Sequence, residues 1–293
     1  MRINNKLSFY FVTTDHLTES IWFRDEQDFK VGMNYIAIIS LLTGIKVLAF
    51  VLMSNHVHIV LQCSEAEAIW FINELKRRYS EYLSRRYGTV EFLRRNKTDI
   101  QEVNFEEQSL ERAIAYTLMN PVSANICLNA SDYPWSSASS YFKVRPSKGI
   151  LSRDLSRRAR RRLLHTKSDI PGETMIGEYG YILPESYIPV RFVESIFRSP
   201  KRLNYFMVNS SKAKKRLNGL DSGVPSFKDQ VILAAVPDIC RTVFKKRSVS
   251  ELSAQELAEL IFSIRRSFFA DVSQIARVIG VSYSDVAGIL ESI

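Results

Sequence analysis

The order of the hydrophobic patterns along the first 120 residues constrains this fold more than any other feature of the sequence. Runs of β-branched and aromatic residues, which are typical of strands, occupy 6–14, 45–53, 56–63 and 98–105. Segments with apolar residues at helical spacing occupy 25–44, 65–88 and 106–120. The resulting order is strand, helix, strand, strand, helix, strand and one more helix. It predicts an α+β fold of the ferredoxin-like type, in which helices cover one face of an antiparallel sheet.

The rest of the chain has a different character, and we expect three parts. A ferredoxin-like domain spans 1–145, a basic connecting segment spans 146–225, and a mostly helical C-terminal domain spans 226–293. Within the second part, 157–165 is a dense basic run, and the polar stretch 210–226 is typical of a linker.

The charge of the chain favours a polyanionic partner. The formal net charge is +9 and the sequence pI is about 9.4, values typical of proteins that bind nucleic acid or acidic surfaces. The three cysteines, Cys63, Cys127 and Cys240, lie far apart and lack the spacing of a metal site. They indicate reduced thiols in a cytoplasmic protein rather than disulfides.

One apolar stretch, 36–53, is nearly long enough to span a bilayer. Gly44 and Lys46 interrupt it, so we interpret it as the end of a buried helix, a turn and a strand. The N-terminal residues lack the apolar core of a signal peptide, and we expect no membrane association.

His56 and His58 stand one residue apart in the expected strand 56–63. Residues i and i+2 of a strand point to the same face, about 7 Å apart, so both imidazoles project together while Val57 and Ile59 face the helices. On an open sheet face such a pair can bind one metal ion. The spacing also arises by chance, so by itself it does not decide between a metal site and two surface histidines.

The sequence around these histidines, AFVLMSNHVHIVLQ, closely resembles the hallmark stretch of the HUH single-tyrosine transposases, and in particular of the REP-associated tyrosine transposases. Two further blocks follow in the family's order, YTLMNPVSANI at 116–126 and DYPWSSASSY at 132–141. The resemblance implies that 1–145 is the catalytic domain of a metal-dependent transposase. Such enzymes cleave and rejoin single-stranded DNA by transesterification, through a 5′-phosphotyrosine intermediate, on hairpin-forming repeats.

The resemblance also implies roles for individual residues. Tyr116 matches the family's nucleophile, and His56, His58 and Asn120 match its metal ligands, with Mg or Mn as the favoured divalent metal. Asn120 lies four residues after Tyr116, and positions i and i+4 share one face of a helix. Asn120 also fits a plain helix end before Pro121. The sequence names no general base, although a phenol with a pKa near ~10 needs help to act as a nucleophile.

The chain departs from the family pattern at two places. Ser123 and Asn125 stand where the family commonly has Arg and Gly, and a Gly-Arg-Phe segment usual before the fourth strand is degraded to FLRRNKTDI at 92–100. Both departures concern DNA recognition more than the chemistry.

Basic residues supply candidate DNA contacts. Phosphate contact is expected from arginines of the second helix and of the basic run, namely Arg77, Arg78, Arg157, Arg158, Arg160, Arg161 and Arg162. A solvated helical face is the alternative for the basic run. Tyr79, Tyr82 and Tyr87 are rival nucleophiles, although their helix favours a basic, DNA-facing surface with aromatic packing.

Residues 273–292 resemble a helix-turn-helix. Ala276 is small where two helices would cross, Gly280 suits a left-handed turn, and Val286 would be buried in the second helix. Helix N-caps are expected at Ser273 and Ser282. The expected recognition helix carries Asp285 and neither Arg nor Lys, so a helical bundle without a DNA role stays open.

The patterns together favour a nucleoid-associated protein, monomeric or homodimeric, that acts on single-stranded or hairpin DNA. A histidine-triad nucleotide hydrolase is disfavoured because its third histidine position is Val60 in this chain. A non-catalytic DNA-binding regulator with the same fold and C-terminal helices stays open. The target DNA sequence, and the use of Tyr116 within its own subunit or across a dimer, are not encoded in these patterns.

Overall fold

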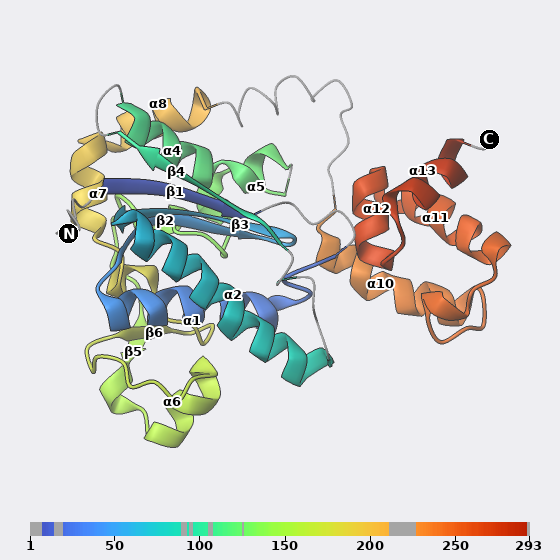
Figure 1. Cartoon of the computed structure of the whole chain (residues 1–293), viewed down its shortest axis with the longest axis horizontal. Coiled ribbons are helices and arrows are strands. Elements are labelled where there is room, and N and C mark those ends of the chain that lie inside the picture. The colour runs from blue at the N-terminus through green and yellow to red at the C-terminus, as the bar shows by residue number, and fades with distance from the viewer. Residues whose placement is uncertain are drawn as a thin grey trace.

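A computed structural model of the chain describes residues 8–14, 20–88, 93, 96–104, 108–124, 126–210 and 227–291. Its elements form a sheet with surrounding helices and a separate group of C-terminal helices (Figure 1). The strands of the main sheet are β1 (Ser8–Thr14), β2 (Lys46–Met53), β3 (His56–Cys63) and β4 (Thr98–Val103). The helices that surround this sheet in the first part of the chain are α1 (Glu26–Thr43), α2 (Glu65–Tyr87), α4 (Ser109–Leu118) and α5 (Asn120–Ser123).

The topology of the main sheet is that of the ferredoxin-like motif. Within the described part of the chain the sheet has four strands in the order β2-β3-β1-β4, and each neighbouring pair is antiparallel. The two central strands, β3 and β1, therefore come from different halves of the motif. The predicted α+β class and the predicted order of elements are confirmed.

Local sequence explains where the first two helices begin and end. The Asp25 side chain caps α1 by accepting a hydrogen bond from the Asp28 amide, and Gly44 ends α1 with a φ of 76°. A capping box between Ser64 and Glu67 begins α2. The apolar stretch 36–53 is thus a helix end, a turn and a strand, as predicted. Among the described helices, none is both long and apolar enough to cross a membrane.

Helices cover both faces of the sheet. α1 and α2 pack together on one face, and α4 packs across β2 and β3 on the other (Figure 1). The expectation of an open face beside the histidines is wrong, because α4 buries Leu110, Ile114 and Leu118 against that face. The apolar side of α4 has to be buried, and α1 and α2 already cover the other face of the sheet.

The aromatic, serine-rich block at 132–141 has a structural role at the outer edge of β2. The Leu52 amide donates to the Trp135 carbonyl at 2.9 Å. The hydroxyls of Tyr133 and Tyr141 also donate to carbonyls of β2, at 2.8 and 2.5 Å. An edge strand exposes unpaired backbone groups, and this block satisfies several of them.

The segment after the sheet packs against both layers. It contains the short strands β5 (Gly149–Leu151) and β6 (Met175–Gly177) and the helices α6 (Arg157–Leu164), α7 (Val190–Phe197) and α8 (Pro200–Val208). α6 contacts α1, whereas α8 contacts α4 on the opposite layer. Most of the expected linker, 211–226, lies outside the described residues, as does Asn125.

The C-terminal region is helical, as predicted. It comprises α10 (Asp229–Thr242), α11 (Ala254–Phe268), α12 (Val272–Ile279) and α13 (Tyr283–Glu291). The two helices α12 and α13 meet as a helix-turn-helix requires, because Ala276 and Val286 are fully buried and Gly280 has a φ of 69°. Ser282 accepts from the Asp285 amide at 3.1 Å, as an N-cap does. The other N-cap prediction is wrong, because Asp271, not Ser273, caps α12.

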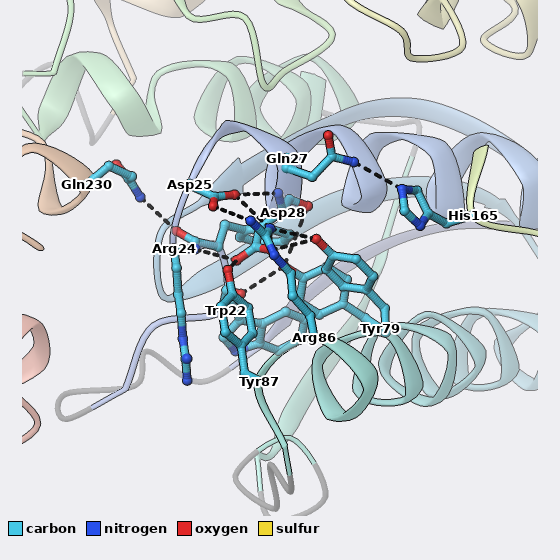
Figure 2. Close-up of polar contacts among 12 residues, drawn as sticks. Trp22, Arg24, Asp25, Gln27, Asp28, Tyr79, Arg86, Tyr87, His165 and Gln230 are labelled. Carbon is cyan, nitrogen blue, oxygen red and sulfur yellow. Dashed lines mark hydrogen bonds and ion pairs between the residues drawn. The ribbon is translucent and has the colours of Figure 1, made fainter. Parts of the chain in front are cut away.

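A buried carboxylate ties α1 to α2 (Figure 2). Asp28 is fully buried and accepts hydrogen bonds from the hydroxyls of Tyr82 (2.8 Å) and Tyr87 (3.1 Å). It also accepts from the Arg86 guanidinium at 2.5 Å and from the Arg24 amide at 2.9 Å. The ion pair and these bonds compensate the desolvation of the carboxylate.

Replacing Asp28 tests this tie. Asp28→Ala leaves Arg86 paired with Asp25 alone and removes the buried acceptor of the Tyr82 and Tyr87 hydroxyls, so we expect the free energy of unfolding to fall by about 3–5 kcal/mol. The matched control is Glu26→Ala in the same helical turn, whose side chain is 80% exposed; a change within about 0.5 kcal/mol is expected there. Urea denaturation followed by circular dichroism measures both, and equal effects in the two variants contradict the assignment.

Candidate functional site

The two histidines of β3 lie beside each other in the interior. Their ring centroids are 4.8 Å apart with an interplanar angle of 83°, and the side chains of His56 and His58 are only 5% and 2% exposed. The alternation of the strand sends Val57 and Ile59 to the α1–α2 face, where both are fully buried. One strand therefore supplies core residues to one face and two imidazoles to the other.

Tyr116 lies against this pair. Its ring centroid is 5.8 Å from that of His58 and 5.7 Å from that of Phe11, edge-on in both cases. Phe11 also stacks on His58 at 5.5 Å. This three-ring cluster joins β1, β3 and α4, so the packing of α4 on the sheet brings the phenol to the histidines.

The phenol of Tyr116 sits in a half-buried position. Burial raises its pKa above the ordinary tyrosine value, because desolvation disfavours the phenolate. At neutral pH the side chain is a protonated phenol. A reaction that uses its oxygen as a nucleophile must therefore remove the proton as the new bond forms.

Asn120 begins α5 one turn after Tyr116. Its side chain is 2% exposed, and its Nδ2 donates to the backbone carbonyls of Tyr116 (3.0 Å) and Thr117 (3.1 Å). These two bonds use the amide nitrogen and orient the side chain, so Oδ1 is the acceptor atom of this amide.

The donor chemistry fits a divalent cation. His56 Nδ1 lies 2.8 Å from the Asn55 amide oxygen, and a protonated Nδ1 there places the lone pair of the ring on Nε2. Imidazoles are good ligands for first-row transition metals, whereas an amide oxygen such as that of Asn120 is a donor that Mg and Mn accept. Among the described residues no group of three or more His, Cys, Asp and Glu gathers as a metal site.

A cavity of about 760 Å³ opens beside Tyr116. β4, α4 and α8 form its walls, and Arg112, Tyr205 and Asn209 are among its lining residues together with Phe11. Tyr205 is 62% exposed, which leaves an aromatic surface for stacking. Sequence reasoning missed the contribution of α8, because no pattern near Pro200–Val208 indicates that this helix docks on α4.

The rival tyrosines lie elsewhere. Tyr79 is fully buried and donates to the Trp22 carbonyl at 2.8 Å, while Tyr82 and Tyr87 donate to Asp28 (Figure 2). Burial raises the pKa of all three phenols. They belong to the α1–α2 layer, on the opposite side of the sheet from His58, and their hydroxyls are used to hold that layer together.

The arginines expected to contact DNA also lie on the α1–α2 side. Arg77 and Arg78 form ion pairs with Glu74, and Arg77 pairs with Glu81 as well. Arg157 lies 3.8 Å from Asp169, whereas Arg158, Arg161 and Arg162 are exposed and form no ion pair with a described carboxylate. Arg160 is partly buried and reaches the Ser152 hydroxyl at 3.5 Å.

A second cavity, of about 770 Å³, lies between α2 and the α6 region. Its basic lining residues are Arg77, Arg78, Arg85, Arg86, Arg161, His165 and Lys167. The structure thus brings several of the expected DNA-contact arginines together, but on the layer opposite Tyr116.

Comparison with known protein families gives one match to part of the chain. Residues 18–98 match the model of a family described as "Transposase IS200 like". This segment is similar to that family and makes up less than a third of the chain. The matched segment contains His56 and His58 and ends before α4, so Tyr116 and Asn120 lie outside it. The match supports a transposase role and the coarse class of a DNA-cleaving enzyme.

One solved structure was also found to be similar, that of a REP-associated tyrosine transposase bound to a REP hairpin. It aligns with 48% of this chain and 82% of its own, at 14% sequence identity and a TM-score of 0.38. No curated protein matches the chain.

Proposed function

We propose that this protein is a metal-dependent transposase that cleaves and rejoins single-stranded DNA through a 5′-phosphotyrosine intermediate, on hairpin-forming repeats. The observation that carries the proposal is the contact between the Tyr116 ring and His58, whose neighbour is His56. The phenol of α4 meets the two imidazoles on one face of β3 there, next to a cavity large enough for a nucleotide.

In the proposed reaction the Tyr116 oxygen attacks a backbone phosphorus of the DNA. The new bond joins the phenol oxygen to phosphorus while the phenol releases its proton to solvent. The bond from phosphorus to the 3′-oxygen breaks, and the leaving 3′-oxygen takes up a proton, so the step consumes no net proton. The phosphodiester energy is kept in the phosphotyrosine bond, so attack by another 3′-hydroxyl reverses the step and joins two strands. No external energy source is needed, because one phosphoester replaces another.

His56, His58 and Asn120 would hold the divalent metal, Mg or Mn. When bound, the metal would polarise a non-bridging phosphate oxygen and so supply electrophilic activation. The chain's own contributions are to hold these donors rigidly in the interior and to hold the phenol against them through Phe11 and His58.

DNA contact through the arginines is a second part of the proposal. α6 presents exposed arginines, and a basic cavity lies between α2 and α6. Both suit contact with DNA phosphates, which adds affinity without sequence specificity. Because this surface and Tyr116 lie on opposite layers, a hairpin substrate would contact the protein on two sides. We propose a nucleoid-associated monomer or homodimer, and a non-catalytic DNA-binding regulator is the alternative outcome of the tests below.

The first test replaces the proposed nucleophile. Tyr116→Phe removes only the attacking oxygen, so covalent protein–DNA adduct should fall below detection while affinity for the hairpin stays within about twofold of wild type. Labelled hairpin strands with Mn, resolved on denaturing gels, report the adduct. Tyr87→Phe, a rival tyrosine on the other layer, should keep the wild-type yield. Normal adduct in Tyr116→Phe rules out this nucleophile, and wild-type protein that binds without any adduct favours the regulator.

The second test concerns the proposed metal ligands. His58→Ala should weaken Mn binding at least about tenfold and abolish cleavage, since a three-donor site loses one of its two imidazoles. Isothermal titration with Mn in the absence of DNA measures the affinity. His165→Ala removes a histidine on the opposite layer and should leave Mn affinity unchanged. Metal-independent cleavage, or equal Mn affinity in the two variants, contradicts the site.

The third test separates the two groups of arginines. Each phosphate contact contributes a slope of about −0.7 to −0.9 to log K against log[salt]. The triple variant Arg158→Gln, Arg161→Gln and Arg162→Gln removes three expected contacts, so its slope should be less negative by about 2. Arg77→Gln should leave the slope unchanged, because Glu74 and Glu81 already pair with that guanidinium. Unchanged slope in the triple variant excludes α6 from the DNA interface.

A further inference from the structure

The C-terminal helices and the histidine strand meet at one buried carboxylate, Asp229, the first residue of α10. Its Oδ2 accepts from the Ser54 hydroxyl at 2.5 Å and from Arg277 Nε at 2.7 Å. Its Oδ1 accepts from Gln274 Nε2 at 2.9 Å and from Arg277 Nη2 at 3.1 Å. Asp229 is only 5% exposed, so these donors compensate a charge that water does not reach well.

Ser54 stands in the tight turn between β2 and β3, two residues before His56. Its backbone carbonyl accepts from the amides of Trp22 (2.7 Å) and Phe23 (3.1 Å), so the turn is held from the β1–α1 connection as well. The next residue, Asn55, places its amide oxygen 2.8 Å from His56 Nδ1. A continuous set of bonds therefore runs from Arg277 of α12 through Asp229 and the turn to the His56 ring.

The junction around this set of bonds is well packed. Ile21, from the segment before α1, is buried in the core of the C-terminal helices. Gln230 donates to the Phe23 carbonyl at 2.8 Å, and α10 lies beside the end of the sheet that carries the β2–β3 turn (Figure 1). The C-terminal region is therefore fixed to the sheet close to the histidines rather than at its far end.

We propose that Ser54 and Asp229 are positioning residues for the histidine site, through which the C-terminal helices fix the orientation of His56. This inference rests on the proposed function, because it assumes that His56 is a metal ligand. A ligand ring held in one orientation binds its metal more tightly than a mobile one, because less freedom is lost on binding. The C-terminal helices are in this view part of the catalytic apparatus even without touching DNA.

Ser54 offers a clean test, because its removal leaves Asp229 paired with Arg277 and Gln274. Ser54→Ala should weaken Mn affinity of the DNA-free protein about three- to tenfold, less than the 10–100-fold typical of groups that bond a ligand directly. The Mn concentration for half-maximal cleavage should rise by the same factor, while the rate at saturating Mn stays near wild type. Ser54→Thr keeps the hydroxyl and should restore the wild-type affinity.

The matched control is Gln230→Ala, which removes the hydrogen bond to the Phe23 carbonyl across the same junction but leaves the bonds of Ser54 to Asp229 and to the Phe23 amide in place. Its thermal midpoint should match that of Ser54→Ala, while its Mn affinity stays at the wild-type value. Equal Mn affinities in Ser54→Ala and Gln230→Ala, with wild-type protein that binds Mn and forms adduct, overturn this inference and leave the proposed function intact. Wild-type protein that neither binds Mn nor forms adduct overturns the proposed function, and this inference with it.

Discussion

The structure depends on one strand being buried on both faces. β3 sends Val57, Ile59 and Leu61 into the α1–α2 core and sends His56 and His58 toward α4. A one-residue slip in its register would exchange the two sets, placing imidazoles in the apolar core and aliphatic residues at the site. The pairing of β3 with both β1 and β2 fixes that register, so the position of the histidines is set by the backbone of the central sheet.

Much of this arrangement could be predicted from the sequence. Alternation in 56–63 and the order of periodic segments give the strand faces and the ferredoxin-like topology, because both follow from local patterns of period 2 and 3.6. The face on which α4 packs could not be predicted in this way. Its apolar residues show that it needs a core, but an amphipathic helix carries no local signal for which side of a sheet receives it. The open face expected beside the histidines was wrong for this reason.

The residues missed by sequence reasoning share a feature, which is that their partners lie far away along the chain. Tyr205 reaches the cavity at Tyr116 only because α8 docks on α4, and Asp229 meets Ser54 across 175 positions. Conversely, Tyr82 and Tyr87 are candidate nucleophiles from the sequence alone, but in the structure both donate hydrogen bonds to Asp28. A residue type in a basic helix does not reveal whether its polar atom faces solvent or a buried carboxylate.

The exposed arginines and the cluster of Tyr116 with the two histidines lie on opposite layers of the molecule, which affects how DNA would be held. The ion pairs of α2 occupy Arg77 and Arg78 with Glu74, while α6 presents its arginines on the same layer. The phenol and imidazoles lie beneath α4, on the other layer. Arginine contacts to the DNA backbone would position the hairpin without reading its sequence. Because these arginines lie on the other layer, the fine alignment of a phosphate with Tyr116 in the proposed reaction would have to come from the site itself. That requirement favours a rigid site, and the bonds from Asp229 through the β2–β3 turn to His56 supply rigidity from a region that is absent from the matched family segment.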